Sequence, residues 1–176
     1  MRSRVHEVNR WAREQAALYR HGEERPLRGY LGAMSVYSLL VATATVAARV
    51  VGRRPPERNT PWDVALLGIA THKLSRMLTK DAVTSPLRAP FVRYQGSAGP
   101  AEVHEEVRER GEVKHAVGEL TSCPFCMAQW VATGLVAGSV LAPHATKLVT
   151  TTFAGIAVSD SLQLGYAALE RLATGD

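Results

Sequence analysis

Long uncharged stretches alternate with strongly charged ones along this chain. Residues 29–48 and 123–142 contain no Asp, Glu, Lys or Arg, and residues 148–169 contain a single one, Asp160. At 1.5 Å per residue, a helix of about 20 residues reaches about 30 Å, the thickness of the hydrocarbon core of a bilayer. The pattern therefore predicts three helices at membrane depth.

Two further stretches are expected to be helical. Residues 62–78 begin apolar and end with basic side chains that can extend to a membrane interface, which makes them a weaker fourth candidate. In residues 5–20, apolar positions recur every three or four residues with Arg between them, which is typical of an amphipathic helix. This helix either packs on the rest of the protein or lies on an anionic membrane surface, with Trp11 and Tyr19 at headgroup depth.

A polar middle segment occupies residues 79–120. Its Pro and Gly residues predict loop up to about residue 100, and its charged second part has helical tendency interrupted at Gly111. The expected fold class is all-α: a small multi-pass helical membrane bundle of about four apolar helices. A basic amphipathic N-terminal helix, 1–28, precedes a single membrane domain, 29–176, with the polar segment inserted at about 79–120. A soluble helical bundle is the alternative.

The distribution of charge gives this bundle an orientation. Of the 21 Lys and Arg residues, 16 lie toward one side of the membrane in a four-span topology, counting Lys73 and Arg76 near the end of residues 62–78, and 5 lie on the other. The positive-inside rule then puts both termini and the middle segment in the cytoplasm. The first 28 residues hold seven Arg and four Glu without an apolar core, so no cleavable signal peptide is expected. Basic residues are dispersed among acidic ones, so a nucleic-acid partner is not expected.

The tetrad Cys123-Pro124-Phe125-Cys126 opens the uncharged stretch 123–142. A helix N-terminus favours a thiolate at Cys123, and Cys126 one turn later can act as a resolving thiol, so the two are candidate redox residues. No strand pattern precedes the tetrad, which excludes a thioredoxin-like fold. A membrane thiol oxidoreductase stays open beside the simpler interpretation that both cysteines pack at the helix entrance, with Pro124 in the first turn.

A zinc site is a further alternative. The spacing of Cys123 and Cys126 suits two ligands of a tetrahedral zinc, and His115 and His104 are candidates for the other two. The sequence offers no second closely spaced ligand pair, so neither a metal nor another cofactor is the primary expectation.

Asp160 is predicted to belong to a buried polar cluster. An ionisable side chain at membrane depth needs a partner, and counting along the helices brings His72 and Lys73 to its level, with Gln129 at a similar depth and Arg76 nearby. The alternative is that Asp160 caps a break between two shorter helices.

Basic residues next to aromatic ones form a candidate anion site. Lys80, Arg88 and Arg93 accompany Phe91 and Tyr94 in the polar segment. They are expected to contact anionic lipid headgroups or a phosphate-bearing ligand, or to be ordinary juxtamembrane charge.

A G-x-x-x-G pattern marks a close helix contact. Gly134 and Gly138 permit close backbone approach, either within the chain or between two copies in a homo-oligomer.

The ordered stretches "LGIATHKLSRMLTKDAVTSPLRAPFVRY", "GEL" and "CPFCMAQWVAT" resemble a bacterial family, that of domain of unknown function 1360, over about Trp62 to Tyr166. The resemblance implies a small multi-pass membrane protein without an established catalytic activity, and some members are described as sporulation or membrane proteins. The motif positions in this chain are Lys73, Arg76, Lys80, Asp81, Pro86, Arg88, Pro90, Phe91, Glu119, Cys123, Pro124, Cys126, Trp130 and Asp160.

Together these patterns predict an integral protein of the bacterial cytoplasmic membrane with a structural or interaction role. Its expected partners are the lipid membrane, including anionic lipid, and a protein partner or a second copy of the chain. Whether it is an enzyme is left open. The alternatives are a thiol-disulfide oxidoreductase or redox sensor that uses the CPFC tetrad, and a soluble helical protein with a Cys/His zinc site.

Overall fold

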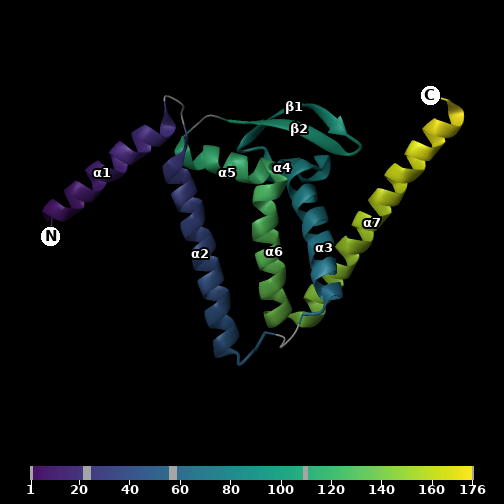
Figure 1. Cartoon of the computed structure of the whole chain (residues 1–176), viewed down its shortest axis with the longest axis horizontal. Coiled ribbons are helices and arrows are strands. Elements are labelled where there is room, and N and C mark those ends of the chain that lie inside the picture. The colour runs from purple at the N-terminus through teal and green to yellow at the C-terminus, as the bar shows by residue number, and fades with distance from the viewer. Residues whose placement is uncertain (1, 22–24, 56–58, 109–110, 176) are drawn as a thin grey trace.

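The computed structural model describes residues 2–21, 25–55, 59–108 and 111–175. Four long helices run side by side in alternating directions, and a polar cap covers one end of them (Figure 1). The helices of the bundle are α2 (Leu27–Val50), α3 (Pro61–Lys80), α6 (Pro124–Leu141) and α7 (Pro143–Thr174). The N-terminal helix α1 (Arg2–Arg20) and the last turns of α7 project away from the bundle on opposite sides.

The polar cap consists of the elements between α3 and α6. It contains the 3-10 helix η1 (Ala82–Thr84), α4 (Ser85–Arg88), β1 (Val92–Gly99), β2 (Glu102–Val107) and α5 (Glu112–Ser122). Helix α5 lies across the ends of α2 and α6, and the two strands form an antiparallel hairpin (Figure 1). The chain is therefore mostly helical, as expected. The predicted all-α fold class is wrong in one respect, because the polar cap contains this β-hairpin.

Local sequence explains where the helices begin. Thr60 caps α3: its hydroxyl accepts from the Asp63 N–H at 3.2 Å, and its own N–H donates to the Asp63 carboxylate at 2.9 Å. This reciprocal pair satisfies two N–H groups that the helix would otherwise leave open. Proline opens α3, α6 and α7, where its missing N–H is not needed.

Residues 102–107 are a strand where the sequence pattern had suggested helix. Val103 is buried and Val107 half-buried, and Glu105, between them on the same face, is nearly buried as well. The alternation of apolar and polar residues typical of a strand is therefore not visible in the sequence, because Glu105 occupies one of the inward-facing positions. Val107 packs on Gly118 of α5, where an added Cβ would lie 2.6 Å from its methyl group.

The apolar core is small and lies between three helices. Ala70 of α3, Leu135 of α6 and Ala154 of α7 form it. Two glycines allow the closest contacts: a Cβ on Gly29 would lie 2.2 Å from the Glu112 carbonyl oxygen of α5, and one on Gly138 would lie 2.6 Å from the Thr146 hydroxyl of α7. Small residues thus let α2 approach α5 closely and let α6 approach α7 closely.

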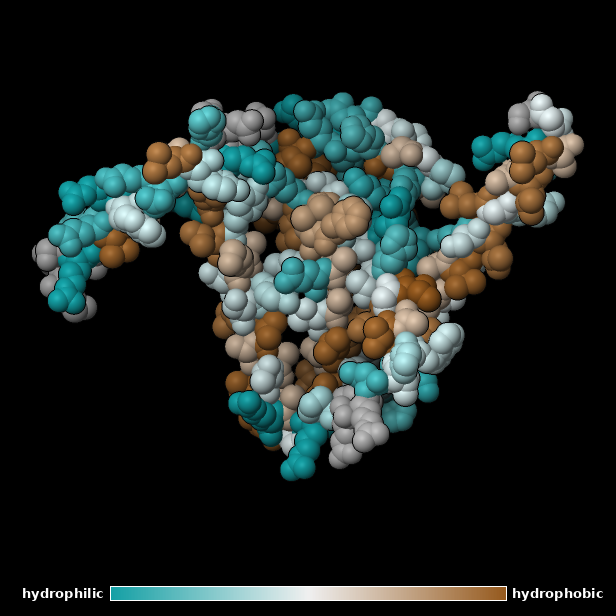
Figure 2. All heavy atoms as spheres, viewed as in Figure 1, coloured by the Kyte–Doolittle hydropathy of each residue, from teal (hydrophilic) through white to brown (hydrophobic). Residues whose placement is uncertain are grey.

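Large apolar side chains cover the outside of the helices. Leu31, Met34 and Leu39 of α2 are each more than 60% exposed. Figure 2 shows apolar residues over the bundle and hydrophilic ones over the polar cap and α1. Among the described residues, α2 and α6 are long and apolar enough to cross a membrane, and neither is buried over its apolar window. Length and composition thus support two spans, and the expected four are not confirmed.

Candidate functional site

The end of α3 next to the polar cap carries a cluster of charged side chains. The Lys73 ammonium lies 2.9 Å from an Asp160 carboxylate oxygen of α7 and 3.7 Å from one of Asp81. Lys73 and Asp81 are less than one fifth exposed, whereas Asp160 is 44% exposed. The lysine therefore joins α3 to α7 and to the residue that ends α3.

A second ion pair lies one turn further along α3. The Arg76 guanidinium donates from Nε at 2.9 Å to one Glu102 oxygen and from Nη2 at 2.6 Å to both oxygens. Such fork-shaped pairs fix orientation as well as charge. Arg76 thus holds the start of β2 against α3.

Backbone contacts set the position of the hairpin tip above these charges. Asp81 forms an isolated β-bridge with Glu102, and the Ala82 N–H donates to the Ala101 carbonyl at 2.9 Å. Ala101 has a φ of 62°, a left-handed conformation that non-glycine residues seldom adopt. The tip turns sharply here, so residues 98–102 form one wall of a cavity.

This cavity, which we call the α3–α7 cavity, has a volume of about 1130 Å³. Its walls are the last turns of α3, the hairpin tip and the second half of α7. The charged and titratable residues of its lining are His72, Lys73, Arg76, Asp81, Glu102 and Asp160.

Four of the five residues of the predicted polar cluster thus line one cavity. The fifth, Gln129, lies on α6 beside the Tyr37 hydroxyl of α2 instead. The polar cluster predicted from the sequence did not include Asp81 and Glu102, which also line this cavity. Asp81 lies eight residues after Lys73 and so falls on the same helix face, which was a usable signal. Nothing in the pattern places Glu102 there, because the hairpin that carries it was not expected.

Arg88 is the most completely buried charged residue described, with a side chain 1% exposed. Its Nε donates to Glu105 at 2.6 Å, and its Nη1 donates to the Leu78 carbonyl and the Thr84 hydroxyl at 3.0 and 2.6 Å. Its Nη2 donates to the Asp81 carbonyl at 3.1 Å and the Ser85 hydroxyl at 3.4 Å. All five guanidinium N–H groups are used inside the fold.

The predicted headgroup residues are therefore not equivalent. Arg88 has no donor left for an external anion and instead ties α3, α4 and β2 together. Lys80 at the end of α3 is half-buried, and Arg93 on β1 is exposed. These two remain accessible at the cap.

The two cysteines lie at the start of α6, as predicted. Cys123 is the N-cap, and its sulfur accepts from the Cys126 N–H at 3.3 Å. Both are free thiols, with Cys123 half-buried and Cys126 exposed, and Phe125 between them is 90% exposed. The tetrad thus begins the helix and leaves one thiol accessible.

Glu119 of α5 connects the tetrad to the N-terminal part of the bundle. Its carboxylate accepts from the Tyr30 hydroxyl of α2 and lies 3.4 Å from His115 and 3.9 Å from Arg25. The sequence marked Glu119 through its motif, but its partners on α2 could not be read from the pattern. Two turns further along α2, the Tyr37 hydroxyl hydrogen-bonds the Thr133 hydroxyl of α6 at 2.7 Å.

The four residues of the alternative zinc site are spread over three elements. His104 is on β2, His115 on α5, and the cysteines are at the start of α6. Within the described ranges, no group of three or more His, Cys, Asp or Glu side chains is placed to hold a metal ion.

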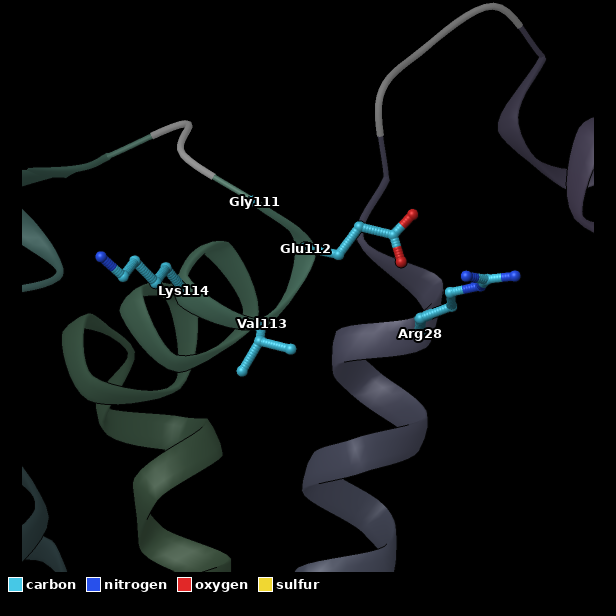
Figure 3. Close-up of a pocket in the computed structure, with 5 residues that line it drawn as sticks. All are labelled: Arg28, Gly111, Glu112, Val113 and Lys114. Atoms are coloured by element: carbon cyan, nitrogen blue, oxygen red, sulfur yellow. The ribbon is translucent and has the colours of Figure 1, made fainter.

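A shallow second cavity, of about 490 Å³, lies between the first turns of α2 and α5. Figure 3 shows Glu112 directed toward α2 and Lys114 pointing away from it. Three charged side chains line this cavity, whereas six charged and titratable side chains line the α3–α7 cavity, which is therefore the stronger candidate.

Comparison with known proteins identifies relatives of the part of the chain that carries these features. "Sporulation protein YjcA" of Bacillus subtilis (strain 168) is 29% identical over 99 residues, which cover 53% of this chain and 83% of the relative. No solved structure matches. The family described as "Protein of unknown function (DUF1360)" matches residues 66–166, which include most of α3, the polar cap, α6 and most of α7. The chain belongs to the DUF1360 family.

Proposed function

We propose that this chain is a multi-pass protein of the bacterial cytoplasmic membrane with a structural or interaction role, and that its polar cap lies on the cytoplasmic side. The observation that carries the proposal is the apolar exterior of the bundle. Large apolar side chains of α2, among them Leu31 and Leu39, face outward, whereas the buried core between the described helices is limited to Ala70, Leu135 and Ala154. A water-soluble bundle does the opposite, because apolar burial drives its folding. Lipid around the helices removes the discrepancy.

The helix arrangement supports four spans. Helices α3 and α7 run alongside α2 and α6 and have similar or greater length, so a bilayer that contains two of them also surrounds the other two. Asp63 and Lys147 lie at the ends of α3 and α7 away from the cap, and the charged residues that line the α3–α7 cavity lie toward the cap, so both groups are near water. Four spans place both termini beside the cap.

The sidedness rests on charge. The cap side holds 16 of the 21 Lys and Arg residues, which is the bias of cytoplasmic segments. Helix α1, with exposed Trp11, Leu18 and Tyr19, then lies at the inner membrane surface.

Fractionation tests the membrane location. The full chain is expressed with a C-terminal tag, and membranes are washed with high salt and then with alkaline carbonate. We expect the chain to stay in the membrane pellet through both washes and to enter solution only with detergent. A monodisperse chain in the supernatant without detergent would contradict the proposal.

The relative's printed name suggests a process to test. This chain is expressed in a Bacillus subtilis strain that lacks the relative, and spores are counted. The counts show whether the chain can replace that protein. Restored counts would support a shared role in sporulation, and unchanged counts with confirmed expression would argue against it.

A thiol function is the second proposal, supported by two free thiols one turn apart with Cys126 exposed. It requires an external dithiol partner, because the chain contains only two cysteines.

A further inference from the structure

The α3–α7 cavity combines fixed charges with an apolar wall. Asp160 is its most accessible carboxylate, and only its Oδ2 faces Lys73, at 2.9 Å. A carboxylate has about four acceptor positions, so Oδ1 can take a further donor. Arg76 is 40% exposed despite its pair with Glu102. The cavity thus presents an acceptor from α7 and a donor from α3.

The balance of charge in the cavity selects among ligands. Its lining contains two permanently cationic side chains, Lys73 and Arg76, and three carboxylates, with His72 as the titratable member. With His72 neutral, the lining carries an excess of one negative charge. A purely anionic ligand is repelled, whereas a group with both an ammonium and a phosphate matches the two kinds of partner.

The apolar wall indicates that the ligand also has a hydrocarbon part. Ile69 of α3 and Val158, Leu162 and Leu164 of α7 line the same cavity. Beyond it α7 diverges from the bundle (Figure 1), and it carries the exposed Leu169 there. The volume of about 1130 Å³ slightly exceeds the range of about 300–1,000 Å³ that is usual for small-ligand sites, which leaves room for a lipid headgroup and part of its chains. Because it lies where the apolar helices meet the polar cap, the cavity is at headgroup level in the proposed membrane orientation.

We infer that the α3–α7 cavity binds a phospholipid whose headgroup carries a primary amine. The ammonium donates to Asp160, the phosphate accepts from Arg76, and the acyl chains follow the apolar side of α7. A quaternary amine offers no N–H to the carboxylate, and a glycerol headgroup leaves the lipid with a net negative charge, so neither fits as well. This inference rests on the proposed membrane location.

Lipid retention by the detergent-purified full chain tests the inference. The protein is mixed with equal amounts of phosphatidylethanolamine, phosphatidylcholine and phosphatidylglycerol of identical acyl chains, and the lipid that remains after gel filtration is measured by mass spectrometry. We expect retention of the ethanolamine lipid to exceed that of the other two by about tenfold, the ratio that one charge-assisted hydrogen bond supplies. Mono- and dimethylated ethanolamine lipids should be retained to intermediate extents.

Variants connect the preference to the cavity. Asp160→Asn should reduce retention of phosphatidylethanolamine to the level of phosphatidylcholine, whereas Glu170→Gln, an exposed acid further along α7, should leave it unchanged. Equal retention of the three lipids by the unaltered chain would overturn the inference without requiring any variant to fold. So would a preference that survives in Asp160→Asn. A chain that fractionates with membranes but shows no preference contradicts the site alone, and a soluble chain contradicts the membrane proposal.

Discussion

Removing the Arg88 side chain should destabilise the polar cap more than any other single charge deletion. Arg88 is 1% exposed, and Glu105, its ion-pair partner at 2.6 Å, is 5% exposed. Arg88→Met leaves the Glu105 carboxylate buried without a counter-charge, and such a broken pair costs about 3–5 kcal/mol. The Leu78 and Asp81 carbonyls also lose their guanidinium donors.

This loss can be measured as a shift in melting temperature. For a chain of this length, 1 kcal/mol corresponds to about 2–4 °C, so Arg88→Met should lower the Tm by roughly 6–20 °C. The assay is thermal unfolding of the detergent-purified protein, followed by circular dichroism. Arg93→Met is the matched control, because Arg93 is exposed on β1 and its loss should change stability by less than about 0.5 kcal/mol.

The double variant Arg88→Met/Glu105→Leu separates charge burial from lost packing. Removing both charges of a buried pair is often neutral or stabilising, so the double variant should recover at least half of the lost Tm. A Tm for Arg88→Met equal to that of the Arg93 control, or a double variant less stable than the single one, would refute the reasoning.

Three further predictions follow from close contacts and from the thiols. Gly29→Ala should lower the Tm by several degrees, because its Cβ would lie 2.2 Å from the Glu112 carbonyl oxygen. Gly32→Ala should leave the Tm unchanged, because Gly32 has open space around it. Equal melting temperatures of the two variants would contradict the close approach of α2 to α5. Gly138→Ala should destabilise the chain through its clash with Thr146, and Gly134→Ala, which meets nothing within 4 Å, should leave it unchanged in the thermal assay. Chemical cross-linking is the second measurement. If the unaltered chain forms a cross-linked dimer and Gly134→Ala does not, the G-x-x-x-G pattern mediates association between two copies instead. If the thiol proposal holds, mild oxidant should form a reversible Cys123–Cys126 disulfide, detected as a mass shift after thiol trapping. Thiols that do not react with the oxidant would contradict the proposal.

The helices could be predicted because their signals are local. The capped start at Thr60 and the prolines at 124 and 143 delimit helices whose apolar runs are visible in the sequence. The span count could not be settled in the same way, because α3 and α7 carry the charges that build the α3–α7 cavity. The charge content of α3 and α7 therefore reflects the α3–α7 cavity as well as the environment around these two helices.

The hairpin was missed for a related reason. Glu105 occupies a buried position between Val103 and Val107, so the strand's alternation was read as a charged, helix-prone run. Only Arg88, distant in sequence, makes that acid tolerable inside the cap. This pairing, distant in sequence, also explains why the pattern suggests a surface position for Arg88. Glu102 is absent from the predicted cluster for a similar reason, because its partner Arg76 lies 26 residues earlier in the chain.

The sidedness of the cap tests the central claim most directly. Single cysteines are introduced at Arg53, in the loop between α2 and α3, or at Glu106, exposed on β2, in a Cys123→Ser/Cys126→Ser background, and spheroplasts are treated with a membrane-impermeant maleimide. If the polar cap is cytoplasmic, Arg53→Cys should be modified in intact spheroplasts and Glu106→Cys only after lysis. Modification of Glu106→Cys in intact spheroplasts, or protection of both positions until lysis, would contradict it.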